Sequence, residues 1–216
     1  MASLFIPSRN ALFLHLPKTA GYSVSTALAE AFPDTQSYPV RDMSRAESAA
    51  SYLGERLDPA VFARTWSFCF VRNPWDWAVS GWLHVTRNTG AYGDSPPSFA
   101  EFLTGSWDQG LKRNPNPRKF NSPQTFVAYH TQLTQSEHLA GRNGEDPVPL
   151  AFYARFEQLS QDWARICDRL GRAISLPHQN KSQRGHYTDY YTDPLREIVA
   201  RRNAALIARF GYAFGE

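Results

Sequence analysis

The chain has 216 residues, which suffice for one sizeable hydrophobic core but are too few for two full domains. Its 23 Lys and Arg residues outnumber 20 Asp and Glu residues, giving a formal net charge of +3. This mild excess favours a local basic site for a phosphorylated ligand and argues against a nucleic-acid-coating surface, which needs a more clustered charge.

No apolar run approaches the roughly 18 residues of a membrane span, and the first residues lack the apolar core of a signal peptide. We therefore expect a cytoplasmic protein with no membrane span and no nucleic-acid partner. The two cysteines, Cys69 and Cys167, lie in apolar stretches without metal-ligand spacing. Buried free thiols are favoured over a disulfide or a metal site.

The first half of the chain alternates between strand and helix patterns. Residues 11–16 predict a short buried strand, and residues 22–32 predict a helix that ends at Phe-Pro-Asp. Residues 44–53 have helical composition, and a short helix is expected to start at Pro59 with Asp58 as its cap. The run WSFCFVR, residues 66–72, is typical of a central strand in a parallel sheet. Asn73 and Pro74 then predict a helix start.

The second half contains a long irregular connection. Residues 88–123 are rich in Gly, Pro, Asn and Ser, with one short helix expected near residues 98–103. Helical signals return over residues 122–130, a strand is expected within 148–156, and an amphipathic helix over 157–170 ends at Gly171. A basic polar loop, residues 177–187, precedes a final helix over 193–210. This alternation predicts an α/β fold with a central parallel sheet flanked by helices, forming one domain over residues 1–216.

The stretch LFLHLPKTAGYSV, residues 12–24, joins the first predicted strand to the first predicted helix. A turn at this position leaves backbone N–H groups at the positive end of the helix, and Lys18 adds a full positive charge. This combination is typical of an anion site. It is not a GxxxxGK[ST] loop, because Lys18 precedes the single glycine, Gly21. The alternative is a solvated lysine at a tight turn.

The stretch FVRNPWDWAVSGWLH, residues 70–84, forms a second corner of the same kind. Arg72 ends the apolar strand, and Ser80 lies about two helical turns further on. A guanidinium group suits phosphate oxygens, and a serine hydroxyl adds a neutral donor. The alternative is a structural Arg–carboxylate pair with a solvated Ser80.

Taken together, the two stretches resemble the nucleotide-binding motifs of sulfotransferases that use 3′-phosphoadenosine 5′-phosphosulfate (PAPS). HLPKTAGYSV resembles the 5′-phosphosulfate loop, and FVRNPWDWAVSGWLH resembles the 3′-phosphate motif. Among these enzymes, the chain most resembles the family 2 carbohydrate sulfotransferases, which include the heparan sulfate 2-O type and bacterial relatives. The stretches YARFEQLSQDWARICDRLG, LPHQNKSQRGHYTDYY and RFGYAF continue the resemblance.

The resemblance implies a P-loop-like α/β domain that transfers a sulfuryl group from PAPS to an acceptor hydroxyl of a glycan or small molecule, releasing PAP, without a metal. Arg72 and Ser80 would hold the 3′-phosphate, and Lys181 and Arg184 lie in a loop that closes over the nucleotide in similar proteins. Residues 85–145 would form the variable acceptor-binding or lid region. The residues that would hold the 5′-phosphosulfate are Pro17, Lys18, Thr19, Ala20, Gly21, Tyr22 and Ser23.

The mechanism needs a group that stabilises the leaving oxygen and a base for the acceptor. We expect Lys18 to stabilise the leaving phosphate oxygen. The family's usual histidine is not found in YPVRDMSRAESAASYLG, where Asp42 stands near its expected place. Asp42 is the first candidate base and His84 the second, the alternatives being a loop carboxylate and a packed histidine. His15 is expected to be structural, and three further histidines stay open as candidates: His130, His138 and His186.

Two other functions compete with this interpretation. A P-loop kinase would need GxxxxGK[ST] and a Mg²⁺-binding carboxylate after a strand, neither of which is evident. A catalytically silent PAP- or glycan-binding protein would explain the missing histidine. The sequence names neither the acceptor nor the oligomeric state.

Overall fold

A computed structural model describes residues 2–39, 49–88, 96–105, 133–140, 149–177 and 184–216. Two compact units are interleaved along the chain. We call residues 1–43, 47–72 and 137–182 the sheet unit, and residues 44–46, 73–136 and 183–216 the helical unit. The expectation of a single domain over residues 1–216 stays a prediction.

The sheet unit contains a five-stranded sheet in the order β3-β1-β2-β4-β5. The strands are β1 (Ala2–Ile6), β2 (Ala11–Phe13), β3 (Gln36–Pro39), β4 (Trp66–Val71) and β5 (Phe152–Arg155). β2, β4 and β5 are parallel, with Phe13 opposite Phe68 and Phe68 opposite Phe152. These three strands confirm the predicted α/β class and the parallel centre of the sheet.

The sheet is nevertheless mixed rather than wholly parallel, because β1 runs antiparallel to both β2 and β3. The link from β1 to β2 is the short 3₁₀ turn η1 (Pro7–Arg9), which Asn10 closes in the left-handed region with φ 46°. A connection this short joins antiparallel strands only, since a parallel crossover needs a dozen or more residues.

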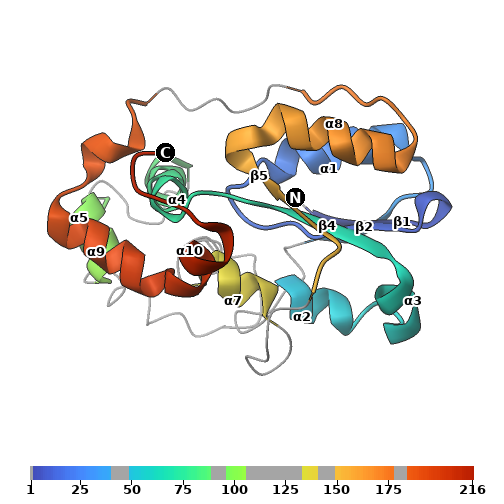
Figure 1. Cartoon of the computed structure of the whole chain (residues 1–216), viewed down its shortest axis with the longest axis horizontal. Helices are drawn as coiled ribbons and strands as arrows, with labels where there is room; N and C mark the ends of the chain where they lie inside the picture. The colour runs from blue at the N-terminus through green and yellow to red at the C-terminus, as the bar shows by residue number, and fades with distance from the viewer. Residues whose placement is uncertain (1, 40–48, 89–95, 106–132, 141–148, 178–183) are drawn as a thin grey trace. The chain divides into compact units, whose positions relative to one another are not determined.

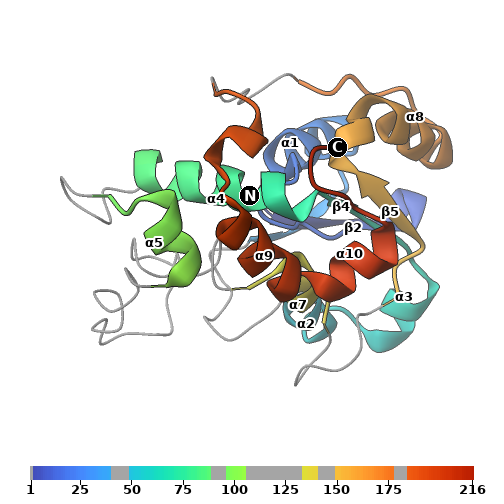
Figure 2. The same cartoon turned by 60° about the vertical axis from the view of Figure 1, so that its left-hand side comes forward.

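Helices α1 (Gly21–Ala31) and α8 (Leu159–Leu170) cover one face of the sheet, and α2 (Ala49–Gly54) and α3 (Pro59–Arg64) lie on the other (Figure 1; Figure 2). The main core lies under α1 and α8, where Val24, Leu28, Ile166 and Leu170 pack with the inward side chains of the strands. Asp58 caps α3 as predicted, by accepting a 2.7 Å hydrogen bond from the Ala60 N–H.

The helical unit is built around α4 (Pro74–Asn88), which packs with α5 (Phe99–Thr104), with the 3₁₀ helix η7 (Tyr187–Tyr190) and with α9 (Asp193–Arg202). α4 begins as predicted, with Asn73 Oδ1 accepting a 3.1 Å hydrogen bond from the Trp75 N–H. The predicted final helix is two helices, α9 and α10 (Ala204–Phe210), separated at Asn203. The predicted helix over residues 122–130 lies outside the described residues.

The chain also forms the short helix α7 (Gln135–Leu139) and the 3₁₀ turn η6 (Phe156–Gln158), which precedes α8. None of the helices within the described ranges is both long enough and apolar enough to cross a membrane.

Candidate functional site

The turn between β2 and α1 has an unusual backbone. Lys18 and Ala20 both have positive φ angles, 61° and 64°. This left-handed region is unfavourable for residues other than glycine. Alternating left-handed residues next to a helix start orient successive N–H groups toward a concavity, which is how backbone nests bind anions.

The start of α1 offers further donors. Ala20 is the N-cap, and no side chain caps the helix. The first hydrogen bond of the helix runs from the Val24 N–H to the Ala20 carbonyl, at 3.1 Å. The N–H groups of residues 21–23 precede that bond and have no acceptor within the helix. With the Lys18 ammonium nearby in sequence, this helix start is chemically suited to a phosphate or sulfate group.

Gly21 is required here by a close contact with His15. A Cβ at residue 21 would lie 1.9 Å from Cδ2 of His15 and 2.2 Å from its Nε2. The His15 ring is 1 % exposed, so it cannot easily move away. His15 therefore packs directly under the first residue of α1, and only glycine lets the helix begin so close to the ring.

The surroundings of His15 disfavour its protonated form. Burial, reinforced by the positive charges of His138 and Lys18, lowers the pKa of His15 to about 3. Its backbone N–H donates to Ser3 Oγ at 3.0 Å. The structural role expected for His15 thus agrees with its burial and its neutral state.

Arg72 lies beside the Lys18 turn. Its Nη1 donates to the Lys18 carbonyl oxygen at 2.9 Å, although 54 residues separate the two in sequence. The guanidinium carbon lies 4.0 Å from the centre of the Phe156 ring, and the residue is 7 % exposed. The contact arises because β2 and β4 are parallel neighbours, so their carboxyl ends meet at one edge of the sheet.

The other predicted residues of the turn divide by exposure. Pro17, Thr19 and Ser23 are buried, and the Thr19 hydroxyl donates to the Leu16 carbonyl at 3.0 Å. The hydroxyl proton of Thr19 therefore stabilises the turn, and its backbone N–H is the group left for a ligand. Tyr22 is 48 % exposed, although it is a large aromatic residue.

The helical unit holds the other predicted binding residues. On α4, Asp76, Ser80 and His84 are spaced by four residues, so they lie on the same side of the helix with a rise of about 6 Å between neighbours. Arg184 Nη2 forms a salt bridge with Asp76 Oδ1, and their side chains are 10 % and 15 % exposed. Arg184 therefore contacts the side of α4 that also carries Ser80. His84 is partly buried one turn beyond Ser80.

Several predicted residues lie outside the described part of the chain, namely Asp42, Lys181 and His130. Two other candidate histidines lie within the described residues. His138 is 0 % exposed in α7, and its charge contributes to the low pKa of His15. His186 is exposed, and its Nδ1 lies 2.8 Å from the Thr188 hydroxyl.

Sequence reasoning missed two features of this site: the packing of His15 against Gly21, and Phe156 beneath the Arg72 guanidinium. Neither has a local sequence signal, because each contact joins residues from different elements. For Phe156, the available clue is that both β4 and β5 were predicted as strands of a parallel sheet. In the structure these two strands are paired with Val71 opposite Arg155, so Arg72 and Phe156 lie at the adjacent strand ends.

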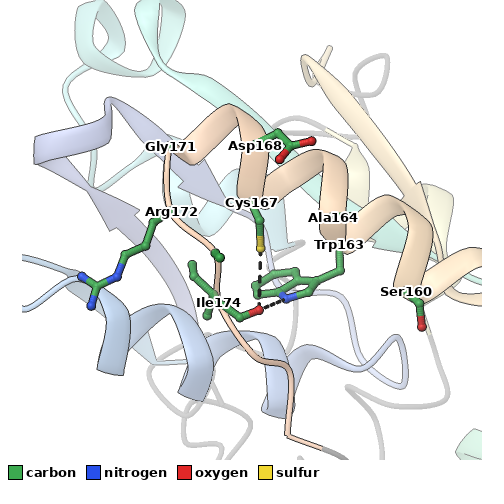
Figure 3. A pocket seen from close by; sticks show the side chains of 9 residues that line it. Ser160, Trp163, Ala164, Cys167, Asp168, Gly171, Arg172 and Ile174 are labelled. Atoms are coloured by element: carbon green, nitrogen blue, oxygen red, sulfur yellow. Dashed lines mark hydrogen bonds between the residues drawn. The ribbon is translucent and has the colours of Figure 1, made fainter.

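A shallow pocket of about 570 Å³ lies on the sheet unit but contains none of the predicted site residues (Figure 3). It is formed along α8 and the segment after it, where Trp163 Nε1 and Cys167 Sγ both donate to the Ile174 carbonyl. Among the residues that the structure describes, no three His, Cys, Asp or Glu side chains are grouped so as to hold a metal ion.

Comparison with known proteins gives one structural similarity. No protein-family model matches the sequence, and no curated protein matches it. The crystal structure of a sulfotransferase from Alicyclobacillus acidocaldarius is similar with 18 % sequence identity and a TM-score of 0.33. The similarity covers 73 % of this chain and 59 % of the sulfotransferase, so the chain spans less than two thirds of that protein.

Proposed function

We propose that this protein is a PAPS-dependent sulfotransferase that transfers a sulfuryl group to an acceptor hydroxyl on a glycan or small molecule and releases PAP. The observation that carries the proposal is the hydrogen bond from Arg72 to the Lys18 carbonyl. The two motifs that resemble the 5′-phosphosulfate loop and the 3′-phosphate motif meet at this bond. Two such strand-to-helix turns side by side would suit a ligand that carries two anionic groups.

The hydrogen-bond donors of the turn suit the anionic groups of PAPS. The turn supplies an ammonium group and an uncapped helix start, both of which favour anions. In the reaction, the bond from sulfur to the bridging phosphate oxygen breaks and its electron pair stays on the phosphate, while the acceptor oxygen bonds to sulfur and loses its proton. Lys18 would stabilise the charge that develops on the bridging oxygen. Asp42 and His84 remain the candidates for accepting the proton.

The first test is binding. The melting temperature is measured with PAP and, separately, with ATP and Mg²⁺, since a ligand that binds only the folded protein raises it. The proposal expects a larger increase with PAP. A larger increase with ATP and Mg²⁺ would favour a kinase and contradict the proposal.

The second test is turnover. Sulfur-labelled PAPS is incubated with the protein and a panel of glycans and small hydroxyl compounds, and labelled product is separated from donor. The proposal expects transfer to at least one acceptor, and no labelled product from a protein that binds PAP tightly would indicate a silent binding protein. Omitting the protein is the control for spontaneous hydrolysis.

A further inference from the structure

We propose that Arg72 positions the 5′-phosphosulfate turn, in addition to the 3′-phosphate contact that the sequence resemblance implies. The inference rests on the proposed function and adds a second role to a residue of the same site. Its basis is the place of the guanidinium group, which bonds to the backbone of the Lys18 turn.

The Lys18 turn needs contacts that hold its conformation. Lys18 and Ala20 are left-handed without being glycine, with φ angles of 61° and 64°. Such residues persist only where their surroundings fix them. The bond from Arg72 Nη1 to the Lys18 carbonyl, at 2.9 Å, acts directly on one of these two residues.

The orientation of the guanidinium group is itself fixed by the sheet. Phe156 lies beneath it at 4.0 Å, and the residue is 7 % exposed. Val71 pairs with Arg155, so Arg72 and Phe156 leave adjacent parallel strands at the same level. The ends of three neighbouring strands, β2, β4 and β5, thus supply the turn, the guanidinium and the ring that supports it.

Fixing the Lys18 carbonyl also fixes the next N–H group. In a planar trans peptide, the C=O of one residue and the N–H of the following residue point in opposite directions. The structure contains no cis peptide bond among the described residues. By holding the Lys18 carbonyl, Arg72 therefore directs the Thr19 N–H away from itself. The N–H is a donor that the 5′ group would use, so Arg72 would affect that group without touching it.

The two roles of Arg72 can be separated by comparing a ligand that has a 3′-phosphate with one that lacks it. Dissociation constants are measured by calorimetry for PAP, which carries both phosphates, and for AMP, which has only the 5′-phosphate. We expect Arg72→Ala to weaken AMP binding roughly tenfold, the scale of one lost hydrogen bond in a binding site, and PAP binding by more. If Arg72 contacted only the 3′-phosphate, AMP binding would not change.

Two further variants test whether the effect comes from the position of the guanidinium group. Phe156→Leu keeps the Arg72 side chain but removes the ring beneath it, so both AMP and PAP should bind more weakly than to the wild type, by a smaller factor than in Arg72→Ala. Arg172→Ala is the matched control, because Arg172 also donates to a backbone carbonyl, that of Ala31, and lies 5.8 Å from the Phe32 ring. It should leave both affinities unchanged.

The outcomes distinguish the inference from the proposed function. Wild-type affinity for AMP in both Arg72→Ala and Phe156→Leu would overturn the positioning role alone. If Arg72→Ala does not fold, unchanged AMP affinity in Phe156→Leu is sufficient to overturn it. A wild-type protein that binds neither PAP nor AMP would overturn the proposed function, and the inference with it.

Discussion

Lys18 combines a strained backbone with the positive charge that the proposed chemistry needs. Its φ of 61° places its carbonyl against Arg72, while its ammonium lies close enough to His15 to contribute to the low pKa of that ring. Around the turn, Lys18 and Arg72 both carry positive charge, and His15 stays neutral. The arrangement thus concentrates positive charge at the turn, and the neutral His15 ring adds none to it.

The role of Lys18 in turnover can be tested directly. Replacing Lys18 with Ala should lower kcat by about a hundredfold to a thousandfold, the usual cost of removing one transition-state donor. The dissociation constant for PAP should change much less, because the extra charge on the bridging oxygen exists only in the transition state. Both quantities are measured with labelled PAPS and by calorimetry, with Lys18→Arg as the charge-conserving control. A kcat near the wild-type value in Lys18→Ala would remove this residue from the mechanism.

His15 predicts how stability depends on pH. The folded protein lowers its pKa from 6.5 to about 3, so between these values the unfolded chain binds the extra proton. The free energy of unfolding therefore falls as the pH drops below about 6.5, by ~2 kcal/mol from this residue between pH 7 and pH 5. In His15→Gln this contribution is lost, and the difference between urea titrations at the two pH values should shrink accordingly. An unchanged difference would mean that the histidine is not neutral when folded.

Among the elements, α8 has the clearest sequence pattern and also an unpredicted start. Its buried residues are Asp162, Trp163, Ile166, Cys167 and Leu170, which follow the helical repeat. The helix starts at Leu159 rather than at residue 157, because a 3₁₀ turn precedes it. Asp162 links α8 to the end of β5, because its Oδ2 accepts a 2.7 Å hydrogen bond from the Arg155 N–H.

Loss of this link should destabilise the sheet unit. Asp162 is 3 % exposed, and Asp162→Ala would leave the partly buried Arg155 N–H without this acceptor. We expect a loss of about 1–3 kcal/mol in the free energy of unfolding, measured by urea titration. Asp168→Ala, on an exposed position of the same helix, should change it by less than about 0.5 kcal/mol. Equal effects of the two variants would contradict the role given to Asp162.

Elements with strong local signals could be predicted from the sequence, whereas those set by distant partners could not. The apolar run of β4 and the caps Asp58 and Asn73 are examples of the first kind. β3 has the sequence QSYP and contains no fully buried residue, so no apolar pattern indicates it. The split between α9 and α10 at Asn203 was missed because the pattern continues across it.

The candidate site follows the same division. That Lys18 and Arg72 would lie at neighbouring strand ends could be predicted, because parallel strands share an edge. The atom that Arg72 contacts could not, because a long side chain has many rotamers and its partner is chosen by packing against Phe156. The Gly21 contact with His15 likewise depends on the angle at which α1 leaves the turn.

At the scale of the whole chain, the last residues are bonded to two other segments of the helical unit. Asn73 Nδ2 donates to the Ala213 carbonyl at 2.9 Å, and the Gly215 N–H donates to the Tyr187 hydroxyl at 2.6 Å. Phe214 packs edge-to-face against Trp75, Tyr187 and Tyr191, with ring centres 5.3–5.7 Å apart. The segment after α10 thus joins the start of α4 to η7.

Replacing Phe214 should therefore weaken the unit as a whole. Phe214→Ala removes three ring contacts, and we expect a loss of about 2–4 kcal/mol in the free energy of unfolding. Phe214→Leu keeps most of the volume and should cost about half as much. Tryptophan fluorescence during urea unfolding provides the measurement, since Trp75 is a direct neighbour. A change below about 0.5 kcal/mol in the alanine variant would show that this segment contributes little.

The interleaving of the two units has a consequence for biosynthesis. β5 and α8 come from residues 137–182, and α9 and α10 come from residues 183–216. A nascent chain on the ribosome therefore carries β1 to β4 without the strand that covers the edge of β4. Neither unit can be completed before the other has begun, so the usual order of one finished domain after another is not open to this protein. Until translation reaches the last strand, the β4 edge is available for wrong pairing, and a chaperone that shields it would have most effect during that interval.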